Sequence, residues 1–151
     1  MKVGIIGSGG REHSLCLSLK KSNRITNLYC FPGNAGTELL AQNVNIELTN
    51  FVKLRDFIRQ NQIDIIVIGP EKPLVDGLVD YLEKNEIKVF GPNKIASQLE
   101  GSKIFTKNLC KKYKIPTADF GIFKNLKESK SFLQNCNYPI VIKADGLAAG
   151  K

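Results

Sequence analysis

The sequence lacks any hydrophobic run approaching the ~20 residues that a membrane-spanning helix requires. A short apolar segment follows Met1 and Lys2 directly, where an export signal would have a charged leader, a longer hydrophobic stretch and a cleavage site. The four cysteines, Cys16, Cys30, Cys110 and Cys136, form no CxxC pair, which argues against a zinc site, a redox motif and a disulfide framework. We therefore expect a cytoplasmic protein with free thiols.

The positive charge of the chain is spread along the sequence. Its 22 basic and 14 acidic residues give a formal net charge of +8. The lysines are dispersed or lie on helix faces such as 111–114, so we expect a solvated surface with a general attraction for anionic substrates. We expect no nucleic-acid partner and no membrane partner. With 151 residues, 42% of them hydrophobic, the chain can form one globular domain, or a domain and part of a second.

Apolar runs alternate with helical patterns along the first ninety residues. The patterns predict strands over 3–6, 27–31, 42–46, 63–68 and 87–90, and helices over 12–22, 51–61 and 74–85. This alternation predicts an α/β fold with a doubly wound parallel sheet, covered on both faces by helices. Ligands of such folds bind at the carboxyl ends of the strands.

Three loops follow expected strands at that edge: GSGGRE (7–12), PGNAGT (32–37) and GPEKPLVDG (69–77). The first loop brings glycine backbone and a helix N-terminus to one point, where an anion can be bound, and Arg11 adds a charged fork. A dinucleotide site is disfavoured, because Glu12 replaces the third glycine and no acidic residue follows the second strand. The loop better fits a smaller phosphorylated ligand. Glu12 could pair with an amine or hydroxyl of that ligand, or could be an ordinary first-turn acid.

The pattern changes after residue 90. We expect a turn over 91–94, a helix from about Ser102 to Tyr113, a strand over 116–123, a helix over 126–136 and a strand over 140–143. A glycine-rich segment, 146–151, then follows; it has three residues between its glycines where a Walker loop has four. It could be a flexible loop over nucleotide phosphates, with Lys143 pointing a charge at them, or an ordinary turn.

Six motifs, in order along the whole chain, resemble those of one enzyme family. They are GSGGREH (7–13), PGNAGT (32–37), GPEKPLVDG (69–77), LEGSKIFTK (99–107), KIPTA (114–118) and IKADGLAAGK (142–151). The sequence is similar to the phosphoribosylamine–glycine ligases, also called glycinamide ribonucleotide synthetases, of the ATP-grasp superfamily. The resemblance implies an amino-terminal Rossmann-like domain over residues 1–100 and the beginning of an ATP-grasp domain over residues 101–151.

The resemblance also implies an activity. Enzymes of this family join the carboxyl of glycine to the amine of 5-phosphoribosylamine in purine biosynthesis, with hydrolysis of ATP to ADP and phosphate and through a glycyl phosphate intermediate. The substrates would be phosphoribosylamine, glycine and ATP, the metal would be magnesium or manganese, and the full-length enzyme would be a monomer.

Site residues carry over from the family motifs as expectations. Substrate contacts are expected from the three loops at Gly9, Gly10, Arg11, Glu12, Gly33, Asn34 and Glu71. ATP contacts are expected at Lys143, at Lys107 or Lys111 on one helix face, and in the glycine-rich segment at Gly146, Gly150 and Lys151. The family's metal ligands and catalytic residues have no counterpart among these residues and are expected beyond Lys151.

Three further expectations follow. His13 is the only histidine, and we expect a structural role, because acyl-phosphate chemistry depends on charge stabilisation rather than on an imidazole base. An enzyme of several domains would be roughly three times longer, so we expect a fragment that does not ligate glycine alone. The alternatives are a stand-alone module that binds a phosphosugar or nucleotide without catalysis, and regulation by NAD.

Overall fold

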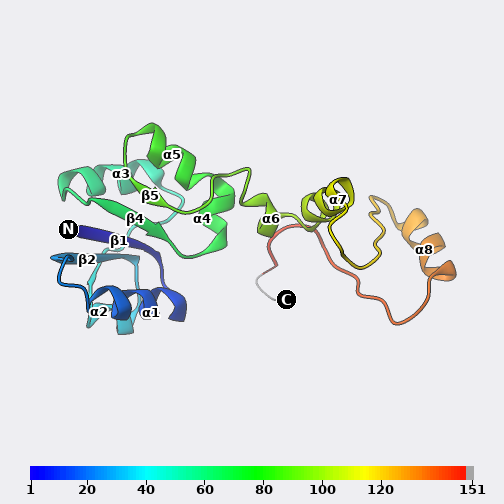
Figure 1. Cartoon of the computed structure of the whole chain (residues 1–151), viewed down its shortest axis with the longest axis horizontal. Helices are drawn as coiled ribbons and strands as arrows, with labels where there is room; N and C mark the ends of the chain where they lie inside the picture. Colours follow the sequence, from blue (N-terminus) through cyan, green and yellow to red (C-terminus); the bar gives the residue numbers. More distant parts are fainter. Residues whose placement is uncertain (149–151) are drawn as a thin grey trace. The chain divides into compact units, whose positions relative to one another are not determined.

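A computed structural model of the chain describes residues 1–148 and divides it into two compact units, the first covering residues 1–97 and the second beginning at Gln98 (Figure 1). The first unit is built on a parallel sheet, whereas the described part of the second contains helices and irregular segments. Over residues 1–148, no helix has both the length and the apolar character needed to span a membrane.

The sheet of the first unit has five parallel strands. They are β1 (Lys2–Gly7), β2 (Asn27–Pro32), β3 (Gln42–Asn43), β4 (Ile65–Ile68) and β5 (Val89–Phe90). Their order is β3-β2-β1-β4-β5, so β1 is central. In the strand register Gly7 lies beside Pro32 and Ile6 beside Ile68. The carboxyl ends of β1, β2 and β4 therefore meet at one edge of the sheet, where the three loops begin.

Helices cover both faces of this sheet. They are α1 (Gly10–Leu19), α2 (Ala35–Glu38), α3 (Phe51–Gln60), α4 (Glu71–Asp76) and α5 (Leu78–Lys84). In Figure 1, α1 and α2 lie on one side of the sheet, and α3 and α5 lie on the other. The doubly wound α/β fold predicted from the sequence is thus confirmed.

Two hydrophobic cores result, because side chains alternate between the two faces of each strand. On one face, Ile6 and Phe31 pack with Leu54 of α3 and residues of α5. On the other face, Ile5 and Cys30 pack with α1. A continuously apolar strand such as β1 is what a sheet covered on both sides requires.

Residues 74–85 do not form the single helix that their pattern predicts. The helix is interrupted at Gly77, which has φ +96°, so α4 ends there and α5 begins at the next residue. Glycine adopts this left-handed conformation without the steric cost of a Cβ atom. The hydrophobic period continues across the break, which is why it gave no sign of two helices.

Two further elements differ from expectation. The third strand is only two residues long, where the sequence predicts residues 42–46. The PGNAGT loop contains the short helix α2, which begins because the side-chain oxygen of Asn34 accepts hydrogen bonds from the backbone N–H groups of Gly36 and Thr37. An asparagine in this position satisfies amides that the first helical turn leaves without a partner.

The second unit contains α6 (Gln98–Gly101), α7 (Lys103–Tyr113) and α8 (Leu126–Asn135). The hydroxyl oxygen of Ser102 accepts a hydrogen bond from the Phe105 N–H and caps α7, close to the predicted helix start. The strands predicted over 116–123 and 140–143 are absent from the described structure. Within residues 98–148 neither segment pairs with a neighbouring strand, and an apolar sequence without a backbone partner does not form a strand.

Candidate functional site

The loop between β1 and α1 brings backbone amides to the carboxyl edge of the sheet. Gly7 ends β1 with φ +128°, Gly9 precedes the helix, and α1 begins at Gly10. The N–H groups of a helix's first turn have no acceptor within the helix, and the helix dipole adds partial positive charge there. This geometry is suited to binding an anion, as the sequence pattern indicated.

Arg11 joins this loop to the loop that follows β4. Its guanidinium donates hydrogen bonds to the carbonyl oxygen of Gly69 and to the carboxylate of Glu71, the latter at 2.9 Å. The pKa of Glu71 is lowered, first by a backbone hydrogen bond at its own residue and then by the Arg11 hydrogen bond. Both side chains remain partly accessible, at 60% and 41% exposed, so they line an open surface.

Glu12 points away from that surface. It is only 4% exposed, and its carboxylate accepts a hydrogen bond of 2.6 Å from the Gly9 N–H. The sequence left open a contact of Glu12 with a ligand amine or hydroxyl, whereas the structure directs its carboxylate beneath the glycine loop.

Asn34 joins the loop after β2 to the loop after β1. Its amide nitrogen donates to the carbonyl oxygen of Ser8 at 2.8 Å, while its side-chain oxygen caps α2. Gly33, with φ +77°, donates its N–H to the Gly7 carbonyl. The hydroxyl of buried Thr37 accepts the Asn34 N–H at 2.7 Å and can donate its hydrogen to the side-chain oxygen of Asn43 at 2.7 Å.

Of the three loops predicted to bind substrate, those after β2 and β4 are therefore each connected directly to the loop after β1. Gly9, Gly10 and Arg11 lie at the exposed surface, and Glu71 is half-buried beside them. His13 is half-buried with its ring against Gly36, where an added Cβ would lie 2.6 Å from a ring carbon. That contact is consistent with a structural role for His13.

The predicted ATP-contacting residues lie in the second unit and differ in their surroundings. The ammonium of Lys107 donates to the Thr117 hydroxyl at 2.7 Å and to the Ala118 carbonyl at 2.8 Å, and it lies 5.2 Å from the centre of the Phe120 ring. Lys111 is on the same helix but exposed. Of these two lysines, Lys107 is the one whose ammonium group is oriented by hydrogen bonds.

Lys143 is exposed, and Gly146 adopts φ +90° with open space around the position of a Cβ. Gly150 and Lys151, the other two predicted ATP contacts, lie outside the described residues. The base of the glycine-rich segment is attached to α7. Asp145 accepts hydrogen bonds from the Ser102 hydroxyl at 3.0 Å and the Ile104 N–H at 3.2 Å, and Lys103 donates to the Gly146 carbonyl.

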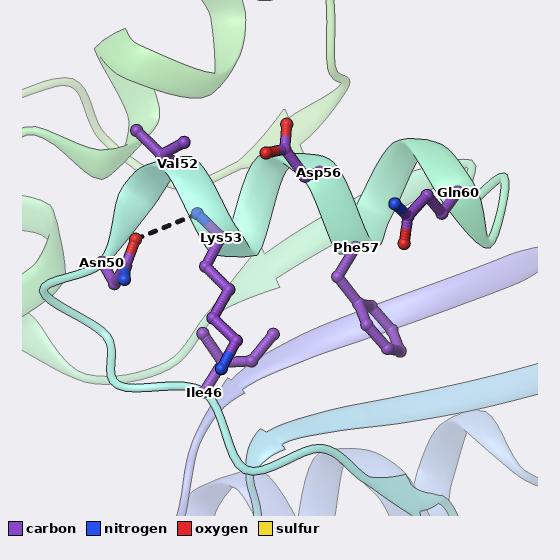
Figure 2. A pocket seen from close by; sticks show the side chains of 7 residues that line it. All are labelled: Ile46, Asn50, Val52, Lys53, Asp56, Phe57 and Gln60. Carbon is purple, nitrogen blue, oxygen red and sulfur yellow. Dashed lines mark hydrogen bonds between the residues drawn. The ribbon is translucent and has the colours of Figure 1, made fainter.

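A shallow hollow of about 380 Å³ lies elsewhere on the first unit, along α3 and the segment before it (Figure 2). In the figure Phe57 points from α3 toward the sheet, where its ring centre lies 5.6 Å from that of Phe31. Asn50 caps the helix by accepting the Lys53 N–H. None of the predicted site residues lines this hollow.

Comparison with known families covers the whole sequence. Residues 1–100 match the N domain of phosphoribosylglycinamide synthetase, and residues 101–151 match its ATP-grasp (A) domain. The chain belongs to the phosphoribosylglycinamide synthetase family. The resemblance inferred from six sequence motifs is confirmed by these matches.

Individual relatives agree with the family match. The chain is 50% identical over 153 residues to a phosphoribosylamine–glycine ligase of Clostridium acetobutylicum, covering 100% of this chain and 36% of the relative. The crystal structure of a phosphoribosylamine–glycine ligase from Thermotoga maritima is similar with a TM-score of 0.77 and 35% identity, covering 100% of this chain and 34% of that one. The chain spans about a third of the length of these relatives.

The sequence did not predict the contacts that hold the synthetase loops together, although it singled out Arg11 and Asn34, which make them. The asparagine and threonine of PGNAGT gave a partial signal, because asparagine is typical of helix N-caps. No local pattern indicated that Asp145 reaches α7, a contact across 43 positions of sequence from Ser102. Such long-range contacts leave no periodic trace in a single sequence.

Proposed function

We propose that this chain provides the phosphoribosylamine site and part of the ATP site of an enzyme that joins glycine to 5-phosphoribosylamine. In the overall reaction the glycine carboxyl and the amine form an amide bond, and ATP is converted to ADP and phosphate. The observation that carries the proposal is the connection of three family motifs at one edge of the sheet by Arg11, Asn34 and the glycine loop. The family matches and the names of the relatives support it.

In this proposal the ribose phosphate binds at the N-terminus of α1. The backbone of Gly9 and Gly10 allows close approach, since an added Cβ on Gly10 would meet nothing within 4 Å. Arg11 supplies a planar cationic group, and a guanidinium held by one loop keeps the fork geometry that matches a phosphate. Its contacts with Gly69 and Glu71 fix its direction before the ligand arrives.

Glu71 is suited to binding the part of the substrate that carries the ribose hydroxyls and the amine. Its lowered pKa keeps the carboxylate ionised at neutral pH, so it can accept hydrogen bonds from a ribose hydroxyl or an amine. Gly33 and Asn34 shape the neighbouring wall of the site through their contacts with Gly7 and Ser8.

The nucleotide would contact the second unit, through Lys107, Lys143 and the glycine-rich segment that begins at Gly146. Lysine ammonium groups act as point charges for phosphates. Over residues 1–148 no group of three or more histidine, cysteine, aspartate or glutamate side chains is placed to hold a metal ion. We therefore assign no magnesium-dependent step to these residues.

Binding of ribose 5-phosphate, a stable compound with the substrate's phosphate and sugar, tests the substrate part of this proposal. Calorimetric titration of the 151-residue chain should show saturable binding. Arg11→Ala should weaken it by about tenfold or more, because a hydrogen bond to a charged group contributes about 1.5–3 kcal/mol. Arg11→Lys should fall between the two, since lysine keeps the charge without the fork.

Arg24→Ala is the matched control, because it removes the same charge from an exposed position on the first unit outside the three loops. It should bind ribose 5-phosphate as the unmodified chain does. If Arg24→Ala and Arg11→Ala weakened binding equally, the loss would come from the change in net charge and not from a specific contact of Arg11. Absence of any binding by the unmodified chain would overturn the proposed substrate site.

A further inference from the structure

The carboxylate of Glu12 is buried directly beneath the proposed phosphate site. With 4% of the residue exposed, it is one of three buried polar residues in the described chain. Its Oε2 atom lies 2.6 Å from the backbone nitrogen of Gly9, the residue immediately before α1. A buried carboxylate needs such a donor, since burial removes the water that would otherwise solvate it.

Glycines from two different loops surround this carboxylate. A Cβ added to Gly7 would lie 2.6 Å from the carboxyl carbon of Glu12, and one added to Gly9 would lie 3.0 Å from Oε2. A Cβ on Gly69, in the loop after β4, would overlap Oε1. The space that Glu12 occupies exists because all three positions lack a side chain.

An acidic residue at the third position of a helix commonly accepts the N–H of the residue before the helix. That role alone does not require burial, because the end of a helix is normally accessible to water. Here the same carboxylate also fills the gap between the loop after β1 and the loop after β4. Its position therefore determines the spacing of two loops as well as the start of α1.

We propose that Glu12 is a positioning residue for the phosphate site, which acts through the Gly9 amide and the backbone at Gly69 and does not itself contact the substrate. This inference rests on the proposed function. By occupying the Gly9 N–H, Glu12 directs the loop so that the first turn of α1 faces outward. By filling the space next to Gly69, it sets the backbone whose carbonyl orients Arg11.

The two roles open to Glu12 predict opposite effects of removing its charge. A carboxylate that contacted an amine or hydroxyl of the ligand would be needed for affinity. A carboxylate that lies behind the loop repels a bound phosphate, and only its hydrogen bond and shape are needed. Glu12→Gln keeps an acceptor for the Gly9 N–H and nearly the same volume, whereas Glu12→Ala removes both.

The experiment is a titration of the 151-residue chain and its variants with ribose 5-phosphate, together with the NMR resonance of the Gly9 amide proton. We expect Glu12→Gln to bind within about threefold of the unmodified chain, or more tightly, and Glu12→Ala to bind about tenfold or more weakly. The Gly9 amide proton should lie downfield in the unmodified chain, and move upfield in part for Glu12→Gln and fully for Glu12→Ala. Glu83→Ala, at an exposed position on α5, is the matched control and should change neither quantity.

A second perturbation reaches the same carboxylate from the opposite loop. Gly69→Ala should weaken ribose 5-phosphate binding and shift the Gly9 amide in the unmodified background, because the new Cβ displaces Oε1. In the Glu12→Ala background it should add little, since the overlapping group is gone. If Glu12→Ala alone folds poorly, Gly69→Ala in the unmodified background and Glu12→Gln still test the proposal; where Glu12→Ala folds, the double-mutant comparison measures the coupling of the two positions.

The outcomes separate this inference from the proposed function. If Glu12→Gln loses ribose 5-phosphate binding while the Gly9 amide stays in place, Glu12 is a direct ligand and the inference is overturned. Additive effects of Gly69→Ala and Glu12→Ala would also overturn it. If the unmodified chain binds no ribose 5-phosphate, the proposed substrate site fails, and the Gly9 resonance in the variants still decides whether Glu12 positions the loop.

Discussion

The two units of the chain differ in how their predicted binding residues are supported. In residues 1–97 the three loops lie at the edge of a sheet with a hydrophobic core on each face. In residues 98–148 the one fully buried residue is Gly101, and Val141 and Ile142 are 80% and 78% exposed. The loops proposed to bind the phosphosugar thus lie on a sheet that is packed on both faces, whereas the residues proposed to bind ATP lie on segments held mainly by hydrogen bonds.

Charge is also divided unevenly. Residues 98–151 contain ten of the 22 basic residues but only four of the 14 acidic ones. Most of the excess positive charge therefore lies in the region where Lys107 and Lys143 are proposed to meet nucleotide phosphates. A local excess of this kind attracts anionic ligands, and salt screens the attraction. Specific positioning in the second unit depends on contacts such as that of Lys107 with Thr117.

The largest expected difference between the units is in the cost of removing a phenylalanine. Phe31 is fully buried in the core on the α3 side of the sheet, with its ring against Phe57, whereas Phe132 is 43% exposed and contacts Phe123. Phe31→Ala should lower the free energy of unfolding of the first unit by about 3–5 kcal/mol. Phe132→Ala should cost about 1 kcal/mol or less, close to the value of one aromatic pair. Hydrogen exchange read peptide by peptide measures each unit separately.

Phe31→Leu is the control for this comparison, because it keeps most of the buried volume and should cost less than about 1.5 kcal/mol. Similar losses for Phe31→Ala and Phe132→Ala would show that the second unit has a core comparable to that of the first. The contrast drawn between the two units would then fail.

The same contrast explains which parts of the fold were predictable from sequence. Strands such as β1 and β4 were found because they are buried on both faces and read as apolar runs. The break at Gly77 was missed, because a single left-handed residue does not interrupt the hydrophobic period. The segments 116–123 and 140–143 have strand-like sequences, but a strand also needs a backbone partner, which local sequence does not specify.

The residues of the candidate site likewise divide into those that local sequence predicts and those whose placement depends on distant contacts. Its glycine loop and Arg11 could be predicted as a phosphate site because the residue types that bind phosphate follow one another in the local sequence. The direction of the Glu12 carboxylate could not, since it depends on Gly69, which is 57 positions away in sequence. Asn34 was predicted as a ligand contact, and the structure adds that its side chain also links two loops.

Thiol reactivity provides a second measure of the difference between the units. Burial, followed by the neighbouring Cys16 thiol, raises the pKa of Cys30 to about 12, and burial also raises the pKa of Cys16. The thiolate is the reactive form, so both should be alkylated by iodoacetamide at pH 8 at least about a hundredfold more slowly than Cys110 and Cys136, which are half-buried. Mass spectrometry of labelled peptides over time gives each rate.

Alkylation in concentrated guanidinium chloride is the control for that measurement, because all four thiols should then react at similar rates. If Cys30 and Cys110 react equally fast in the folded chain, the core around α1 opens readily. The first unit would then be no better packed than the second.

The smallest expected effect concerns the contact that holds the glycine-rich segment to α7. The pKa of Asp145 is lowered from its ordinary value of 3.8, first by the hydrogen bond from the Ile104 N–H and then by that from the Ser102 hydroxyl, among others. A lowered pKa in the folded state means that the contact stabilises the fold above the unfolded-state pKa, and that this contribution is lost as the pH falls through the folded-state value. The Ile104 amide resonance should therefore titrate with a midpoint below 3.8. Asp145→Asn should abolish that titration. A midpoint at or above 3.8 in the unmodified chain, or an unchanged titration in the variant, would mean that this carboxylate does not anchor the segment. The second unit would then have one polar contact fewer than the structure gives it, and its contrast with the packed first unit would be larger.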